Sequence, residues 1–365
     1  MILEHLFVQD YRNLIQADLD FSHRLNCFVG HNGMGKTNLL DAIYYLSFCR
    51  SSINPSDSQT VRHGAECFQI QGTYSMPTGD RTVIGCMSRP QGRKQFKRDR
   101  KEYSRFSDHI GYIPAVMLSP QDSELISGGS EERRRFMDMV ISQYDQEYLK
   151  DLIDYNKALM QRNVLLRSEP EPDAALFLMW EMIMADKGMR IYAKRQQLVE
   201  RLARLFDDMY SRIGESHEKV SLNYCSHASQ GNLADMFESG RTKERIVGYS
   251  LHGIHRDELE MCLGGYPIRR EGSQGQNKSF LTALKLAQYS LLAESCGKRP
   301  ILLMDDIFDK LDAGRVERIL RIVAQEPGFG QVFITDVDRN HIDRILEGIG
   351  IDHKVFTIEN GNVMI

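Results

Sequence analysis

The pattern of apolar and polar positions near the start of the chain predicts a strand, a loop and a helix in succession. Residues 25–29 are mostly apolar and are typical of a buried strand. Residues 38–48 carry apolar side chains at helical spacing, and a glycine-rich segment separates the two. Further along, residues 301–304 and 331–335 are candidates for two more buried strands. The pattern favours an α/β fold with its ligands at the carboxyl ends of the strands.

From about residue 51 to residue 120 the pattern changes to short runs that are typical of β-strands. We predict an antiparallel lobe here, at about residues 60–120, inserted after the first helix. Its three predicted strands are residues 67–74, 82–87 and 115–118. Hairpins are also predicted at both ends of the chain, one around Tyr11-Arg12-Asn13 and one around Glu359-Asn360-Gly361.

Two long helical patterns follow the lobe. Apolar residues repeat with a period near 3.6 from residue 131 to about residue 167, and again from about residue 174 to residue 213. Pro170 and Pro172 separate the two, because proline lacks a backbone donor and restricts the residue before it. We therefore expect a helical subdomain at residues 126–215. Residues 1–125 and 216–365 would form the main domain.

Composition and charge then limit the class of protein. The chain has 365 residues, of which 42% are hydrophobic and 26% charged, as in ordinary globular proteins, and its length suits two domains. Its seven cysteines are scattered without a C-x-x-C pair, which argues against a zinc site and a disulfide framework. No apolar run approaches a membrane span and no signal-peptide pattern opens the chain, so we expect a soluble cytoplasmic protein. A net charge of −4 excludes a globally basic nucleic-acid binder but allows a local basic patch.

The glycine-rich segment matches the phosphate-binding pattern G-x-x-x-x-G-K-T. Its glycines let backbone N–H groups converge on a phosphate, Lys36 can reach the β- and γ-phosphates, and the Thr37 hydroxyl suits Mg²⁺. A tight turn without a ligand is the simpler explanation, but the strand and the helix on either side favour a nucleotide-binding loop. The residues expected to contact the nucleotide are Gly30, His31, Asn32, Gly33, Met34, Gly35, Lys36, Thr37 and Asn38.

A pair of carboxylates complements this loop. Residues 301–304 are followed by Asp305 and Asp306, so a strand buried on both faces would deliver two acids at its carboxyl end. We expect Asp305 to hold Mg²⁺, directly or through water, and Asp306 to act as general base toward an attacking water. Two ordinary acids in a turn are the alternative.

A third motif, Ser273-Gln274-Gly275-Gln276, opens a predicted amphipathic helix at residues 279–295. A small-polar-Gly-Gln segment shortly before an acidic strand resembles the signature motif of ABC-type ATPases. In that family the signature faces a nucleotide held by the loop of a second subunit. The resemblance therefore implies that three residues meet the nucleotide of a second copy of this chain, with Ser273 also catalytic. They are Ser273, Gly275 and Gln276.

The same resemblance assigns residues outside these motifs. It places Gln121 in the Q-loop, as a catalytic and metal residue, and Asp312 in the D-loop after Lys310-Leu311, where it would contact the nucleotide. Thr335 and Asp336 stand where transporters of the family carry a switch histidine. The implied fold is an ABC-type P-loop ATPase head with an antiparallel β lobe and an inserted helical subdomain.

Further stretches resemble the RecF family of bacterial recombination mediators, in the family's order along nearly the whole chain. They are Tyr11-Arg12-Asn13, residues 128–138, residues 253–258, Ser273-Gln274-Gly275-Gln276 and Asp305-Asp306. The resemblance implies a weak, DNA-stimulated ATPase that uses ATP and Mg²⁺ and forms an ATP-dependent homodimer on gapped or junction DNA. It also implies slow hydrolysis as a timer for release, and work with RecR and RecO to promote RecA loading. Gln121 and Ile254 stand where the family commonly has Glu and Pro.

Basic residues supply candidate DNA contacts. Residues 89–105 hold eight basic residues against two acids, with Phe96 and Tyr103 among them, as in a hairpin that follows phosphates. A solvated hairpin and a helix-end cluster of ion pairs are the structural alternatives. Arg12 is either a solvated turn charge or a contact to a bound phosphate. The candidate DNA contacts are Arg93, Lys94, Lys97, Arg98, Lys101, Arg133 and Arg134.

Two other functions compete with this one. An SMC-type repair ATPase of other purpose is disfavoured because residues 131–213 are too short for a long coiled-coil arm. The soluble ATPase subunit of a transporter is disfavoured by the absence of the switch histidine and by the large helical insertion.

Overall fold

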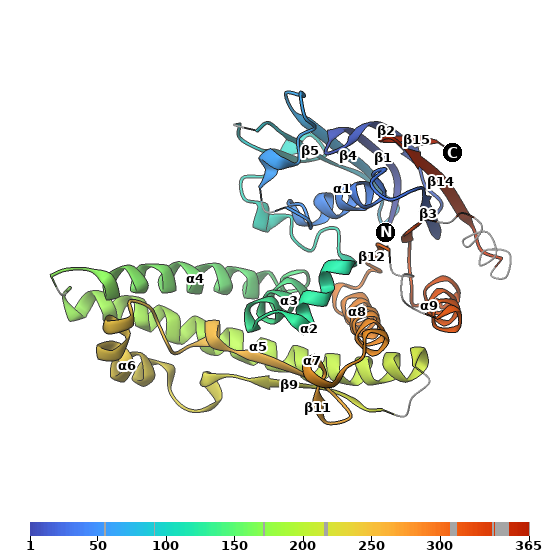
Figure 1. Cartoon of the computed structure of the whole chain (residues 1–365). Coiled ribbons are helices and arrows are strands. Elements are labelled where there is room, and N and C mark those ends of the chain that lie inside the picture. Colours follow the sequence, from blue (N-terminus) through green and yellow to red (C-terminus); the bar gives the residue numbers. More distant parts are fainter. Residues whose placement is uncertain are drawn as a thin grey trace. The chain divides into compact units, whose positions relative to one another are not determined.

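The chain folds into two compact units (Figure 1). The computed structural model describes residues 1–54, 56–90, 92–170, 172–214, 218–306, 312–337, 339 and 350–364. The first unit comprises Met1–Asp122, Met209–Ser216 and Gln274–Ile365, and the second comprises Ser123–Asp208 and His217–Ser273. We expected the segment after the long helices to return to the main domain at residue 216. Instead, the residues from His217 to Ser273 group with the helices.

Among the described residues, twelve strands of the first unit form one sheet, in the order β7-β6-β5-β4-β1-β2-β15-β14-β3-β13-β12-β8. The strands span the following residues: β1 Ile2–Tyr11, β2 Leu14–Asp20, β3 Leu25–Val29, β4 Phe68–Ser75, β5 Arg81–Ser88, β6 Gln95–Arg98, β7 Lys101–Glu102, β8 Ala115–Leu118, β12 Ile301–Met304, β13 Val332–Asp336, β14 His353–Glu359 and β15 Asn362–Met364. The predicted hairpins at the two ends of the chain are confirmed as β1–β2 and β14–β15.

The strands β14, β3, β13, β12 and β8 are parallel to one another and form the half of the sheet that carries the glycine-rich loop, and β15, antiparallel to β14, joins them to β2. We predicted β8 as part of the antiparallel lobe, and this is wrong, because β8 pairs in parallel with β12. All four residues of β8 are buried. A continuous apolar run of this kind is typical of a parallel strand that is covered on both faces.

The other half of the sheet is the antiparallel lobe, made of β1, β2, β4, β5, β6 and β7. Helix α1 (Lys36–Phe48) contacts strands of both halves and is buried on almost every side. Gly72 of β4 faces this helix, since a Cβ there would lie 2.8 Å from Cδ1 of Leu46. The odd-numbered residues of β4 therefore point to the opposite face of the lobe. Two more helices of the first unit are α8 (Gln274–Cys296) and α9 (Ala313–Gln325).

The second unit is mainly helical. Its helices are α2 (Glu124–Ser127), α3 (Ser130–Ser142), α4 (Gln146–Arg167), α5 (Ala174–Ile213, whose last turn belongs to the first unit), α6 (Leu233–Val247) and α7 (Ile268–Glu271). Strands β9 (Val220–Cys225), β10 (Glu258–Leu263) and β11 (Tyr266–Pro267) form a small antiparallel sheet. The predicted helix at 174–213 is confirmed, whereas the predicted helix at 131–167 is interrupted, because Asp145 caps a new helix by accepting a hydrogen bond from Tyr148 N.

Two fully buried arginines join the elements of the second unit. Arg162 of α4 forms ion pairs with Glu181 of α5 and Glu244 of α6, at 2.9 and 2.7 Å. Arg195 of α5 pairs in the same way with Asp138 and Asp257, at 2.9 Å each. Removing one partner of such a pair leaves a buried charge without compensation. In the part of the chain that is described, no helix is long and apolar enough to cross a membrane.

Candidate nucleotide site

The loop between β3 and α1 depends on glycine at defined positions. Gly30, Gly33 and Gly35 have φ values of 154°, 81° and 118°. A Cβ on Gly30 would lie 2.4 Å from the carbonyl oxygen of Ile358, and one on Gly35 would lie 2.9 Å from Oδ1 of Asn13. The contact at Gly30 is with backbone and excludes a side chain, and at Gly35 the positive φ disfavours one. The loop can therefore approach the backbone of β14 only if position 30 remains glycine.

Lys36 begins α1, and its ammonium group turns back over the loop. Nζ donates hydrogen bonds to the carbonyl oxygens of Gly30 and His31, at 2.6 and 3.0 Å. Burial lowers the pKa of Lys36, and three nearby carboxylates act in the opposite direction. A cation held over a glycine loop in this way is placed to exchange the two carbonyl groups for phosphate oxygens.

The two carboxylates after β12 are held by a threonine on the neighbouring strand. Thr335 of β13 donates a hydrogen bond from Oγ1 to Oδ1 of Asp305 at 2.8 Å and accepts one from the backbone N–H of Asp306 at 2.8 Å. Thr37 donates to the same oxygen of Asp305 at 3.0 Å. Burial raises the pKa of Asp305, and the two hydroxyl groups partly offset that effect.

Asp306 has an unusual backbone conformation. Its φ is 48°, in the left-handed region that a non-glycine residue rarely adopts, at a cost of about 1–3 kcal/mol. The hydrogen bond from its N–H to Thr335 is one of the contacts that maintain this conformation. Strain of this kind concentrates at functional sites, where it directs a side chain that an ordinary turn would place elsewhere.

These groups surround one small cavity of about 150 Å³ at the start of α1. Its lining residues are Asn32, Gly33, Gly35, Lys36, Thr37, Asn38, Asp305, Asp306 and Thr335. The hydroxyl of Thr37 and the carboxylate of Asp305 are oxygen donors of the kind that Mg²⁺ prefers. In the described part of the chain, no cluster of three or more His, Cys, Asp or Glu side chains could hold a metal alone. A metal here would need phosphate oxygens or water to complete its coordination.

Arg12 lies beside the cavity, in the turn between β1 and β2. It too has a left-handed backbone, with φ at 56°. Its Nη1 donates to Oδ1 of Asn38 at 3.4 Å, and its Nε lies 3.5 Å from Oδ2 of Asp41. Nε and Nη2 are buried and make no hydrogen bond among the described residues. Buried N–H groups of this kind are available to an anionic ligand near the start of α1.

The remaining predicted nucleotide residues do not line this cavity. Gln121 is exposed in the turn Pro120–Ser123, which follows β8. Asp312 caps α9, where its Oδ1 accepts a hydrogen bond from Arg315 N at 2.9 Å. Arg315 also donates to the carbonyl oxygen of Gly275 at 3.4 Å, so α9 is linked to the first turn of α8. Lys310 and Leu311 lie outside the described residues, and the roles of Gln121, Ser273, Gln276 and Asp312 stay predictions.

Three of the predicted DNA contacts are engaged within the fold. The ammonium of Lys94 lies 2.6 Å from the carbonyl oxygen of Cys49 and 2.8 Å from Oδ2 of Asp57. Arg133 donates from Nε and Nη2 to the two carboxylate oxygens of Glu258, at 2.6 and 2.8 Å. Arg134 donates from Nη1 to the carbonyl oxygen of Asp257 at 2.8 Å. These contacts favour the structural alternative, and we leave all three residues out of the DNA surface proposed below.

The other four basic candidates lie at the lobe surface. Arg93, Lys97 and Lys101 are exposed. The guanidinium of Arg98 is half-buried, with its carbon 4.5 Å from the ring centroid of Tyr112. Because Lys97 and Glu102 are directly paired, they share one face of the β6–β7 hairpin, and Arg98 and Lys101 share the other. The hairpin therefore presents its basic side chains to two different surfaces.

Sequence reasoning missed the part played by Thr335, which we noted only as standing in place of a histidine. The signal that could have found it is the order of the strands. Residues that end adjacent parallel strands meet at one edge of the sheet, so the last residues of β13 belong beside Asp305.

Comparisons with known proteins show what this chain is similar to. Residues 2–359 match the family model described as RecF/RecN/SMC N terminal domain. The chain is 55% identical to the DNA replication and repair protein RecF of Bacteroides fragilis over 363 residues, covering 100% of this chain and 98% of that protein. It is 48% identical to the protein of the same description from Porphyromonas gingivalis, with 100% of both chains covered.

Solved structures give the same result. Two structures of the recombination mediator protein RecF in the RecFOR pathway, RecF-ATPrS and RecF-ATP, superpose with a TM-score of 0.88 at 29% identity, over 99% of this chain. The matched region covers 97% of the RecF-ATPrS chain and 98% of the RecF-ATP chain. An Smc head domain from Pyrococcus furiosus, at 17% identity and a TM-score of 0.59, shares the fold.

Proposed function

The chain belongs to the RecF family of DNA replication and repair proteins, and we propose that it is an ATP-dependent recombination mediator that dimerises on DNA. The observation that carries this proposal is the convergence of Lys36, Thr37 and Asp305 on one cavity at the carboxyl ends of parallel strands. The family is one of ABC-like ATPases, and this cavity supplies the groups that phosphate binding requires.

ATP is the proposed nucleotide, with Mg²⁺ as its metal. The loop N–H groups and Lys36 would hold the phosphates, and Thr37 and Asp305 would hold the ion together with phosphate oxygens. The two nitrogens of Arg12 that make no hydrogen bond, Nε and Nη2, support an additional phosphate contact beside α1. The solved relatives named as RecF-ATP and RecF-ATPrS support the choice of nucleotide.

Hydrolysis is proposed to be slow and to increase with DNA. Asp306 is the candidate general base, because its carboxylate follows Asp305 directly and its backbone is held by Thr335. Such a base contributes only when a water and the γ-phosphate are both in line with it. A site completed only by a second copy of the chain would meet this condition part of the time, which would make turnover slow.

The second copy is proposed to contribute the signature residues. Ser273, Gly275 and Gln276 lie where α8 begins, and the positive end of a helix dipole favours a phosphate. Asp312 belongs to the same proposed half of the site through the link between Arg315 and Gly275. In this proposal two nucleotides join two copies of the chain, and hydrolysis releases them.

The proposed partners follow from the family. We propose that the dimer binds gapped or junction DNA in the cytoplasm and acts with RecR and RecO to promote RecA loading. The relatives described in the RecFOR pathway support this assignment. The SMC-type and transporter alternatives are not favoured, since the full-length relatives at 48–55% identity are described as DNA replication and repair proteins RecF.

Sedimentation velocity with ATP, with ADP and without nucleotide tests the proposal. We expect a dimer with ATP alone, and ATP turnover that rises when gapped, duplex or single-stranded DNA is added. Lys36→Met serves as the control, because it removes the phosphate contact and should leave a monomer in every condition. A wild-type chain that binds ATP and stays monomeric would exclude the ATP-gated dimer.

A further inference from the structure

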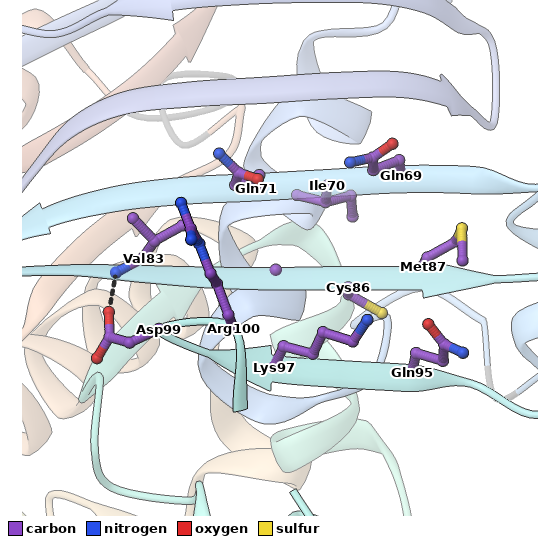
Figure 2. A pocket seen from close by; sticks show the side chains of 11 residues that line it. Gln69, Ile70, Gln71, Val83, Cys86, Met87, Gln95, Lys97, Asp99 and Arg100 are labelled. Carbon is purple, nitrogen blue, oxygen red and sulfur yellow. Dashed lines mark hydrogen bonds between the residues drawn. The ribbon is translucent and has the colours of Figure 1, made fainter. Parts of the chain in front are cut away.

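A second and larger cavity, of about 640 Å³, lies on the antiparallel lobe (Figure 2). It is open on the face of β4, β5 and β6 that points away from α1, as the orientation of Gly72 indicates. None of its lining residues belongs to the nucleotide cavity. Of its lining residues, only Lys97 was a candidate from the sequence, because a cavity on a sheet face exists only once separate strands are aligned.

The pairing of the strands aligns the side chains of this face in rows. One row, here called the glutamine row, crosses five strands through directly paired residues and spans about 19 Å at ordinary strand spacing. Its members are Gln95, Met87, Gln69, Gln9 and Gln16. The adjacent row contains Lys97, Gly85, Gln71, Phe7 and Asp18. Among the described residues, no hydrogen bond engages the amide groups of the five glutamines on this face.

Gly85 forms the hollow in the centre of the cavity. A Cβ there would come no closer than 3.9 Å to its nearest neighbour, the carbonyl oxygen of Ile70, so the space above it is empty and a side chain would fit. Glycine in the middle of a strand weakens the strand and often marks a place where a ligand or another backbone approaches. The absence of a side chain at Gly85 is therefore a feature of the cavity and not a requirement of the fold.

Positive charge is concentrated at one end of this face. Lys97 and Arg100 line the cavity, and in the described part of the chain neither forms an ion pair; Glu102, which lies across from Lys97, pairs with Arg93 at 3.5 Å. The nearby carboxylate of Asp99 is occupied, since it accepts a hydrogen bond from the hydroxyl of Thr82 and another, drawn in Figure 2, from Val83 N. An anion entering this end would therefore meet two cations that are not held in ion pairs.

The position of Arg100 supports a binding role. Asp99 and Arg100 form the turn between β6 and β7 with φ values of 50° and 71°, a conformation in which Asn-Gly is normally favoured. Arginine at this position adds backbone strain that glycine would avoid. Figure 2 shows its side chain lying across β5 toward Gln71, over the cavity.

We propose that this face binds an unpaired strand of nucleic acid, with Lys97 and Arg100 at the phosphates and the glutamine row at the base edges. Each amide offers a donor and an acceptor, as a base edge does, and Gly85, Met87 and Phe7 offer an apolar surface to the flat bases. A duplex would not suit a cavity on a sheet face, because the base edges of a duplex are reached only by an element that enters a groove. The inference rests on the proposed function, and it specifies where and in which form DNA binds.

An acidic peptide is the other ligand that the charges would attract. It would satisfy Lys97 and Arg100, but its carboxylates offer only acceptors, so they would pair with the amide N–H groups of the glutamine row and leave the amide carbonyl oxygens without a donor. The row therefore favours bases over acidic side chains. The peptide is kept as an arm of the experiment.

Fluorescence anisotropy on the full-length chain tests the proposal with three probes: a mixed-sequence single strand, a blunt duplex of equal length, and poly-glutamate. Gly85→Leu fills the cavity and should weaken single-strand binding about tenfold, with little change for the duplex. Ser75→Leu is the matched control, on the same face of β4 but outside the cavity lining, and should bind like the wild type. Thermal melting by circular dichroism shows that each variant folds.

Charge is tested on the same hairpin. Lys97→Glu should weaken single-strand binding several-fold and reduce its salt dependence, whereas Lys101→Glu makes the same charge change on the opposite face and should do much less. Equal losses for the two variants, unchanged single-strand binding by Gly85→Leu, no single-strand binding by the wild type, or tighter binding of poly-glutamate would each overturn the proposal. ATP-dependent dimerisation without DNA is measured separately, so that failure of the proposed function is recognised on its own.

Discussion

Thr335 is the residue through which the two carboxylates of the nucleotide site are joined to the sheet. Its hydroxyl donates a hydrogen bond to the carboxylate of Asp305 and accepts one from the backbone N–H of Asp306. A single side chain therefore positions both acids. The residue is completely buried at the end of β13. Because β13 also pairs with β3, which leads into the loop, the loop and the carboxylates are fixed to one rigid element.

Replacement of Thr335 by valine keeps the shape of the side chain and removes both hydrogen bonds. We expect Thr335→Val to lower ATP turnover about 10–100-fold, as changes to groups that orient metal and catalytic ligands usually do, while ATP binding changes much less. Thr335→Ser keeps the hydroxyl and should restore most of the turnover. Steady-state turnover and equilibrium binding of ATP measure the two effects. Equal loss in the serine and valine variants would mean that packing, and not positioning, explains the role of Thr335.

At the scale of elements, His109 connects the segment after the basic hairpin to α1. Its ring nitrogens lie 2.7 Å from the carbonyl oxygen of Leu46, in α1, and 3.1 Å from the hydroxyl of Tyr103. Burial lowers the pKa of His109 to about 4, against an ordinary value of 6.5. The folded state therefore keeps this histidine neutral in a range of pH where the unfolded chain binds a proton.

The sign of the pH effect follows from this difference. Between pH 6.5 and about 4 the unfolded state binds more protons at His109, so stability falls as the pH falls, by up to about 1.4 kcal/mol per pH unit. His109→Gln removes the titrating group, and its stability should fall less steeply toward acid than that of the wild type. Urea unfolding followed by circular dichroism from pH 7 to pH 4 measures this. If the free energies of unfolding of the two proteins differed by the same amount at every pH in that range, His109 would not cause the pH dependence.

The sequence predicted most of these elements because their signals are local. The strand, loop and helix around Lys36 have strong periodicity and a specific motif, and the structure has them where we expected them. The break before α4 was missed because no proline or glycine marks it, and only the capping of Tyr148 N by Asp145 reveals it. The antiparallel pairing predicted for β8 was wrong, because an apolar run of four residues does not indicate which strand it pairs with.

Side-chain roles were harder to predict than elements, because charge alone does not reveal a partner far away in the sequence. Lys94 and Arg133 look in the sequence like their exposed neighbours Arg93 and Arg135. The fold brings Asp57 to Lys94 and Glu258 to Arg133, from 37 and 125 residues away. The cavity on the lobe was missed for the same reason, since the glutamine row exists only once five strands are aligned.

At the scale of the whole molecule, the proposed site is divided between two copies of the chain. One copy would contribute the loop, with Lys36, and the other the signature, with Ser273. Each copy would then contribute to both sites of a symmetric dimer, as the two-fold symmetry of such an assembly requires. A defect in the loop can then be separated from a defect in the signature. A mixed dimer can combine the intact loop of one variant with the intact signature of the other.

Mixing two inactive variants tests this division directly. Lys36→Met should not bind ATP, and Ser273→Arg should bind ATP without dimerising or responding to DNA. Because neither variant dimerises alone, the dimers that form in an equal mixture contain both variants, and each has one intact site of two, so turnover should recover to at most about half of the wild-type value. A mixture as inactive as its components would place the loop and the signature of each site in the same copy, because two sites that each lie within one copy cannot complement one another.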